Sequence, residues 1–211
     1  ILDTFTELEA ELEAELEARK KQYEHYRDQL LSFPEGGVER VPLRNIAEII
    51  SGKDYRHLDV GHVPVYGSGG VMSHVNEHAS IGPSVLLPRK GSISNIFYVE
   101  GPFWNVDTIY RTKIDNDIIN SKFLYYYLEN YGIERLNTSN AARPALTRNV
   151  LYDIPVPLPS LEVQTNVVQM LDKFDALLSD IYSGLPAEIE ARRKQYEYYR
   201  DKLLTFKEKA S

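Results

Sequence analysis

The residues best suited to metal or acid–base chemistry lie near the middle of the chain. His57, Asp59 and His62 form an H-x-D-x-x-H string, and His74 and His78 stand four residues apart, which puts both on one face if that segment is helical. Glycines surround the first group, the second has weak helical propensity, and no acidic third ligand has a defined spacing. The pattern therefore favours surface or hydrogen-bonding histidines over a metal site. A hydrolase built on His57, Asp59 and His62 stays open as an alternative.

Other catalytic signatures are absent from the sequence. The loop Gly67-Ser68-Gly69-Gly70 lacks the G-x-x-x-x-G-K-[ST] pattern and the strand-to-helix context of a phosphate loop, and is typical of a simple turn. The chain has no G-x-S-x-G elbow and no methyltransferase-type catalytic motif. With zero cysteines, thiol catalysis, thiolate metal sites and disulfides are excluded.

Composition and charge narrow the class of protein. At 211 residues, 43% hydrophobic and 26% charged, the chain can bury one core with helical appendages. No apolar run reaches the roughly 20 residues of a membrane span, and residues 1–20 lack the order of a signal peptide, so we expect a cytoplasmic protein without a membrane partner. The net charge is −7, but residues 34–160 hold 13 acidic and 12 basic residues. Local patches therefore decide what this segment binds.

An internal repeat marks the two ends of the chain. Residues 15–33 (ELEARKKQYEHYRDQLLSF) and residues 188–206 (EIEARRKQYEYYRDKLLTF) share 14 of 19 positions. These two segments are offset by 173 residues, whereas upstream residues 2–5 match residues 171–174 at an offset of 169. The second copy therefore carries four extra residues, about one helical turn, which we place around residues 183–186.

Both copies show an apolar stripe with helical periodicity, which is typical of coiled-coil helices that pair with each other or with a second chain. The residues expected to form this helix-pairing seam are Leu12, Leu16, Tyr23, Tyr26, Leu30, Ile189, Tyr196, Tyr199 and Leu203. The acidic run of residues 7–17 is expected to be a solvated face that serves helix pairing and the docking of partner subunits.

Residues 34–160 lack the helical repeat of the two ends. This segment begins with the turn residues Pro34-Glu35-Gly36-Gly37 and ends in a proline-rich stretch. We predict strands at residues 38–43, 63–66, 84–87, 96–99 and 154–157, a helical turn at residues 45–50, and a helix over residues 120–130 capped by Asn120. Residues 146–152 fit no single pattern. The fold class is α+β: a mixed domain (34–160) between an N-terminal helix (1–33) and a C-terminal helix (161–211).

The exit from this domain carries a resemblance to a known family. Residues 154–164 read IPVPLPSLEVQ and lead into a long helix that contains MLDKFDALLSDI and then EARRKQYEYYRDKLL. This P-L-P-x-x-x-x-Q segment and the duplicated KQYE-x-YRD-x-LL ending resemble a specificity subunit of a Type I restriction-modification system. The resemblance covers essentially the whole chain. Family members usually hold two recognition domains, so this chain resembles a half-subunit form with one target-recognition domain.

The resemblance implies a non-catalytic DNA reader. Methyltransferase and endonuclease activities would reside in separate modification and restriction subunits, with S-adenosylmethionine bound by the modification subunit and no cofactor or metal bound by this chain. Two recognition domains would bind two half-sites of double-stranded DNA, and the paired helices would set the distance between these half-sites. A helix of about 33 residues, at about 1.5 Å per residue, is about 50 Å long, which corresponds to roughly 15 base pairs. A symmetric homodimer would read a split, palindromic site.

Base readout needs amide, hydroxyl and guanidinium groups on loops, with further cations on phosphates. Comparable loops lie at the DNA face in the family. The residues expected to contact DNA are Arg89, Lys90, Ser92 and Asn95 in one loop, Asn140, Arg143, Thr147 and Arg148 in a second, Tyr66, Ser68 and His74 around the glycine-rich turn, and Lys53 and Arg56 as phosphate contacts. Trp104 is expected in the core. The alternative to a DNA reader is a coiled-coil scaffold or adaptor whose middle domain binds protein or glycan.

Overall fold

The computed structural model describes residues 2–34, 36–137 and 144–204, and the chain divides into two compact units. Residues 1–29 and 169–211 supply the first unit, and residues 30–168 form the second.

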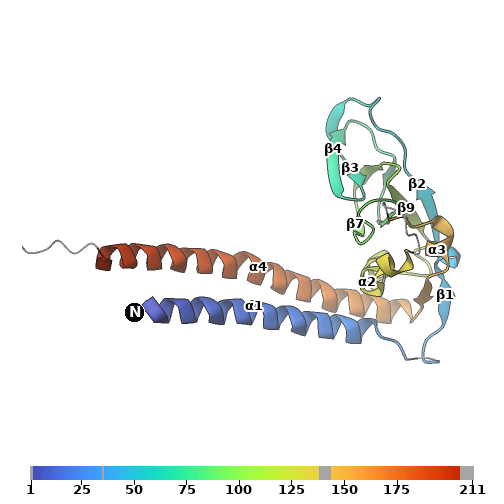
Figure 1. The fold of residues 1–211 in the computed structure, drawn as a ribbon. Coiled ribbons are helices and arrows are strands. Elements are labelled where there is room, and N and C mark those ends of the chain that lie inside the picture. The colour runs from blue at the N-terminus through green and yellow to red at the C-terminus, as the bar shows by residue number, and fades with distance from the viewer. Residues whose placement is uncertain (1, 35, 138–143, 205–211) are drawn as a thin grey trace, which may run out of the picture. The chain divides into compact units, whose positions relative to one another are not determined.

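The first unit contains most of two long helices, α1 (Leu2–Leu31) and α4 (Leu161–Leu204), which run side by side in opposite directions (Figure 1). The rings of Tyr23 and Tyr26 pack against Phe174 of α4, with ring centroids 6.4 and 5.6 Å away. The Tyr23 hydroxyl donates a hydrogen bond of 2.6 Å to Asp175. Tyr23 and Tyr26 therefore contact a helix of the same chain.

Other members of the predicted seam are less fully described. Leu16, Leu30 and Tyr196 are half-buried. Nothing is described of the side chains of Leu12, Ile189, Tyr199 and Leu203, so their helix pairing stays a prediction. Residues 183–186, where we place the extra turn of the second repeat, lie within the helical span of α4. None of the helices in the described ranges is long and apolar enough to cross a membrane.

The described residues of the second unit form three small sheets. The first pairs β1 (Arg40–Pro42) with β10 (Pro155–Pro157). The second has the order β2 (Ala47–Ser51), β9 (Ile109–Ile114), β6 (Ser84–Pro88), β7 (Phe97–Val99). The third has the order β4 (Gly70–Val75), β3 (Val60–Gly67), β8 (Pro102–Asn105), β5 (Ser80–Ile81). Every pairing within these sheets is antiparallel except β3 with β8.

Two groups of buried side chains hold these sheets together. All five residues of β6 are buried, as expected of an apolar strand between two neighbours. Leu86, Phe103 and Ile109 pack in one cluster, and Val65 packs with Trp104 in another. Trp104 is 7% exposed and its indole N–H donates a 3.0 Å hydrogen bond to the carbonyl of Lys53. The prediction of Trp104 as a core residue is thus confirmed.

Helix α2 (Ser121–Tyr131) confirms the predicted helix and its cap. The Asn120 side chain accepts hydrogen bonds from the backbone N–H groups of Lys122 and Phe123, which have no partner within the helix. The helix ends at Gly132, whose φ of 68° is a left-handed conformation that glycine adopts without strain. A short 3₁₀ helix, η2 (Ile133–Leu136), follows.

The helical turn predicted for residues 45–50 is wrong. A 3₁₀ turn, η1 (Leu43–Asn45), ends there, and the next residues form β2, which pairs with β9. The physical reason is the alternation of buried Ala47 and Ile49 with exposed Glu48, a two-residue period that suits a strand. Residues 146–152, which fitted no pattern, contain the short helix α3 (Arg148–Tyr152) capped by Thr147. His74 lies on β4 and His78 follows that strand, so the two do not share a helix face.

Candidate nucleic-acid interface

The connection between β8 and β9 gathers the polar loops of the second unit. The Thr108 carbonyl accepts hydrogen bonds from the backbone N–H groups of Arg89 and Lys90, at 2.9 and 3.2 Å. The Thr108 hydroxyl accepts from the N–H of Ser68 at 3.2 Å. The Asn95 side-chain amide donates to the Ser68 carbonyl at 3.1 Å. The loops that follow β3 and β6 therefore lie against one turn, although sequence separates them by about twenty residues.

The described end of the second predicted loop joins the same group. The Leu146 N–H donates to the Arg89 carbonyl at 2.9 Å, and the Gly91 N–H donates to the Pro144 carbonyl at 3.2 Å. Lys90 and Ala145 form an isolated antiparallel bridge. The structure thus places the first predicted DNA-reading loop against the described end of the second. Asn140 and Arg143 lie outside the described residues.

Three cations and one carboxylate occupy this group, which we call the loop cluster: Arg89, Lys90, Asp107 and Arg148. The guanidinium carbons of Arg89 and Arg148 lie 5.9 and 5.8 Å from the centroid of the Tyr110 ring, within the range of a cation–π contact. Tyr110 itself is buried in β9. One rigid ring therefore contacts two guanidinium groups, one from the loop after β6 and one from the first residue of α3.

Hydrogen bonds fix the cations of the loop cluster further. Arg89 donates to the Asp107 carbonyl at 3.1 Å, and Arg148 donates to the Ser51 hydroxyl at 2.8 Å. The Lys90 ammonium lies 2.8 Å from an Asp107 carboxylate oxygen. This hydrogen bond from Lys90 is the main cause of the lowered pKa of Asp107, so the carboxylate is charged at neutral pH.

Several predicted DNA-contacting residues have structural partners. Thr147 accepts a hydrogen bond from the Val150 N–H as the cap of α3, and the Tyr66 ring packs near Phe97 and Phe103. Ser68 is buried beneath the loops. Their contact with DNA stays a prediction. Ser92, in contrast, is exposed in the loop that carries Lys90.

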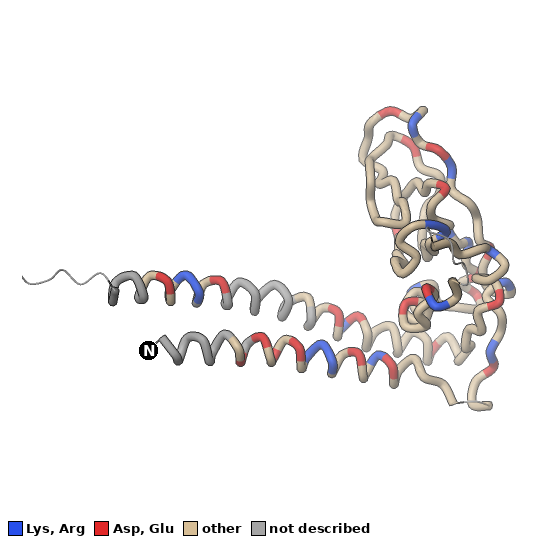
Figure 2. Tube along the Cα trace, viewed as in Figure 1, with Lys and Arg blue, Asp and Glu red and all other residues tan. Residues whose placement is uncertain are grey.

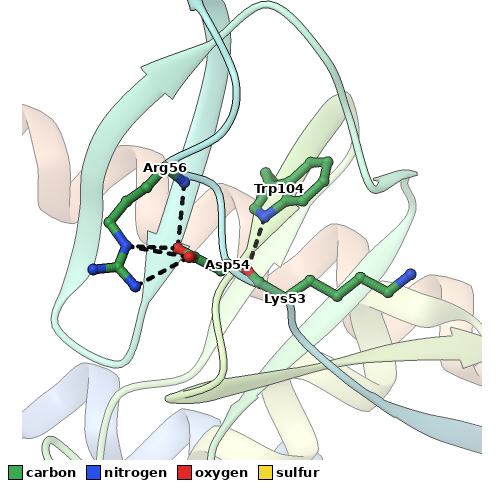
Figure 3. Close-up of polar contacts among 4 residues, drawn as sticks. All are labelled: Lys53, Asp54, Arg56 and Trp104. Carbon is green, nitrogen blue, oxygen red and sulfur yellow. Dashed lines mark hydrogen bonds and ion pairs between the residues drawn. The ribbon is translucent and has the colours of Figure 1, made fainter.

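The remaining predicted residues lie on the β2–β3 connection and on β4. The Arg56 guanidinium folds back onto Asp54, with its Nε 3.0 Å from one carboxylate oxygen, whereas the Lys53 side chain extends away from that pair (Figure 3). Hydrogen bonds from Arg56 lower the pKa of Asp54. Lys53 makes no ion pair within the described part of the chain. His74 is exposed on β4. Neither Arg56 nor His74 has a described hydrogen bond to a member of the loop cluster.

Sequence reasoning missed Asp107, Tyr110 and Ser51. Asp107 and Tyr110 follow the buried β8, and nothing local distinguishes them from ordinary turn and strand residues. Ser51 ends β2 and meets Arg148 across 97 positions of sequence. Basic and acidic positions are interspersed through the second unit rather than segregated (Figure 2). The sequence offered only one indirect signal. Acidic and basic residues are nearly equal in number in residues 34–160, so local ion pairs determine which cations are available to a ligand.

Among the described residues, no group of three histidine, cysteine, aspartate or glutamate side chains is arranged to hold a metal ion. His57 packs edge-on against Trp104, with ring centroids 6.0 Å apart. This contact gives His57 an aromatic packing partner, and the surface or hydrogen-bonding role expected of these histidines stays a prediction.

The structure thus combines a pair of long helices with a separate α+β domain whose loops carry a group of cations. The family described as Type I restriction modification DNA specificity domain matches residues 35–191. The specificity subunit of the Type I restriction enzyme EcoR124I/EcoR124II from Escherichia coli is 34% identical over 98% of this chain and 58% of its own length. A putative type I specificity subunit of Mycoplasma pneumoniae is 32% identical over 99% of this chain and 91% of its own length. The chain belongs to the family of Type I restriction-modification DNA specificity domains.

Solved structures share the fold. The S subunit of a Type I restriction-modification system from M. genitalium matches with a TM-score of 0.65 and 23% identity, over 92% of this chain and 57% of that chain. The HsdS subunit from Thermoanaerobacter tengcongensis matches with a TM-score of 0.66 and 14% identity, over 92% of this chain and 55% of that one. This chain therefore spans a little over half the length of these two proteins and of the E. coli subunit.

Proposed function

We propose that this chain recognises a DNA sequence as the specificity subunit of a Type I restriction-modification complex, in a form with one target-recognition domain. The observation that carries the proposal is the loop cluster, where two loops predicted to contact DNA meet. The backbone of Arg89 and Lys90 is bonded to Thr108, and the guanidinium groups of Arg89 and Arg148 contact the Tyr110 ring. Family membership supplies the ligand class. Access to DNA places the working protein in the cytoplasm.

The chemistry of the loop cluster suits a duplex. Guanidinium groups can bond two acceptors of guanine in the major groove, and ammonium groups bind phosphates. Exposed Ser92 and the cations of the same loop combine both kinds of contact. Lys53, which extends from the β2–β3 connection, would bind a phosphate (Figure 3). With 12 basic residues against 13 acidic ones in residues 34–160, the affinity of the domain alone is modest.

The helix pair provides the assembly platform. Two such chains in a homodimer would place two domains on a split, palindromic site, and the helices would set the separation of the half-sites. Met170 and Leu177, seven residues apart on α4, are 48% and 59% exposed. This spacing leaves an apolar stripe for a helix of another chain. Modification and restriction subunits would dock on these helices and contribute S-adenosylmethionine-dependent methylation and cleavage, so this chain itself performs no catalysis.

The test is salt-dependent binding of the full chain to duplex DNA, followed by sequencing of duplexes that it enriches from a randomised pool. We expect an enriched sequence, and a fall in log K with log salt concentration of about 0.9 for each phosphate contact. Arg148→Ala should reduce this slope or the enrichment at one position, whereas the control Arg135→Ala, an arginine stacked on Tyr131, should not. Absence of salt-dependent binding and of any enriched sequence would favour the scaffold alternative.

The spacing role has its own test. Deletion of four residues from α4 removes about 6 Å of helix and should shift the preferred spacing of half-sites by roughly two base pairs, with each half-site unchanged. Light scattering of the deleted and the full chain, alone and with a modification subunit, gives the oligomeric state. An unchanged spacing in a fully assembled complex contradicts the spacer role of the helices.

A further inference from the structure

Asp107 is the one acidic residue of the loop cluster, and two contacts of its own, with those of the next residue, place it beside both cations of the β6 loop. Its carboxylate pairs with Lys90 at 2.8 Å, and its own carbonyl accepts a hydrogen bond from Arg89 at 3.1 Å. The next residue, Thr108, accepts the backbone N–H groups of both cations. A negative charge therefore lies among the cations that we propose contact DNA.

The position of Asp107 is unfavourable for simple attraction to DNA. A carboxylate beside phosphates is repelled by them, and an ammonium held by a carboxylate is not available to release a counterion from DNA. The pair is also of little use to folding, because both side chains are about half exposed and solvent screens their attraction. The main-chain hydrogen bonds of Arg89 and Lys90 to Thr108 already hold the loop in place.

We propose that Asp107 is a specificity-determining residue that holds Lys90 in an ion pair and thereby suppresses binding to non-cognate DNA. A non-cognate duplex is bound through its phosphates, which must displace the carboxylate from Lys90 and tolerate its charge. On the cognate sequence, base contacts from the loop cluster take the place of a phosphate contact by Lys90, so the ion pair with Asp107 stays intact. The carboxylate therefore lowers the non-cognate affinity more than the cognate affinity and widens the gap between the two. This inference rests on the proposed function and assigns a residue role within it.

A matched control is available in the same unit. Asp153 pairs with Arg44, an arginine outside the loop cluster, and its side chain is exposed to a similar degree. Asp107→Asn and Asp153→Asn change the net charge of the chain by the same amount. The two variants therefore separate a local effect at the loop cluster from a general effect of charge.

The experiment measures binding of the full chain to a mixed-sequence duplex across a salt titration, and the enrichment of sequences from a randomised duplex pool. For Asp107→Asn we expect about eightfold tighter binding to the mixed-sequence duplex at about 0.1 M salt, and a slope steeper by about 0.9, which corresponds to one freed cation. The enrichment of the preferred sequence should fall by a similar factor. Asp153→Asn should change neither quantity by more than about twofold.

A second pair of variants isolates Lys90. In a Lys90→Gln background the Asp107→Asn substitution should no longer steepen the salt slope, because no ammonium remains to be freed. Unchanged non-cognate binding in Asp107→Asn, in a wild-type chain that does enrich a sequence, overturns the role of Asp107 and leaves the proposed function intact. A loss of cognate affinity without a gain in non-cognate affinity also overturns it, because Asp107 would then contact a base amino group. A wild-type chain that enriches no sequence overturns both.

Discussion

Gln164, in the first turn of α4, lies within the second unit, and its replacement gives the sharpest test of how that unit is held together. The side chain is fully buried. Its oxygen accepts a 2.7 Å hydrogen bond from the backbone N–H of Asn120, the cap residue of α2, and its amide donates to the carbonyls of Pro159 and Ile118 at 2.8 and 3.4 Å. One side chain therefore satisfies three backbone groups from two segments.

The expected loss of stability follows from the burial of the backbone groups that lose their closest hydrogen bonds. Gln164→Leu keeps the volume of the side chain but leaves the Asn120 N–H and the Pro159 carbonyl without their partner. A fully buried unsatisfied group costs about 1–3 kcal/mol, and these two residues are half-buried, so water partly replaces the lost bonds. We expect a loss of about 2 kcal/mol in the free energy of unfolding. For residues 30–168, with an unfolding entropy of about 0.3 kcal/mol/K, this lowers Tm by about 7 °C.

Gln164→Glu adds a dependence on pH whose sign can be derived. A carboxylate accepts from Asn120 but cannot donate to Pro159, and its charge is buried beside carbonyl oxygens, so its pKa in the folded chain is raised. The protonated acid restores a donor. The variant should therefore approach wild-type stability below the unfolded-state pKa, near about pH 4, and lose stability as the pH rises through the raised folded-state pKa.

Thermal unfolding followed by circular dichroism, at about pH 5 and about pH 8, measures both effects. The control is Gln169→Glu, an exposed position on the same helix. The reasoning is refuted if Gln164→Leu lowers Tm by less than about 2 °C, or if Gln164→Glu shows the same pH dependence as the control.

Three further substitutions test other contacts. Tyr127→Phe removes the hydroxyl that donates to the Pro155 carbonyl and should cost about 1 kcal/mol in chemical denaturation. Because burial raises the pKa of Tyr127 above 10.0, wild-type stability should fall as the pH rises past that value, and the phenylalanine variant should lack this loss. Phe174→Ala removes the ring that Tyr23 and Tyr26 contact and should lower the unfolding free energy of the helix pair by about 2 kcal/mol, seen as an earlier loss of helical ellipticity. Thr112→Val breaks the hydroxyl bonds to the backbone of buried β6 and should cost about 2 kcal/mol, measured by urea unfolding with an unchanged m-value.

Local signals account for the parts of the fold that the sequence predicted. Helix α2 was predictable because an Asn cap precedes an apolar periodic segment and a glycine ends it. The strands β3, β6 and β7 were predictable from short apolar runs between turn residues. The segment of β2 was misjudged because its neighbours in sequence resemble a helical turn, and only its pairing with β9, about sixty residues away, makes it a strand.

The candidate site divides in the same way. Arg89, Lys90 and Arg148 were predictable because cations beside small polar residues mark two loops. Asp107 was not, because its role arises from a contact with Lys90 across 17 positions. The same holds for Tyr110, which meets Arg89 and Arg148 only after β9 has paired with β6. Residue types thus predict which loops carry the candidate site, whereas long-range pairing determines which charges oppose one another.

The loop cluster also separates stability from recognition. Its loops are held to one another by main-chain groups, through the bonds of Arg89 and Lys90 to Thr108, Leu146 to Arg89 and Gly91 to Pro144. These bonds do not depend on which side chains the loops carry. Side chains that project from the loops, such as exposed Ser92, can therefore be exchanged without disturbing the backbone that presents them. A domain built in this way can change the DNA sequence that we propose it reads while it keeps its fold.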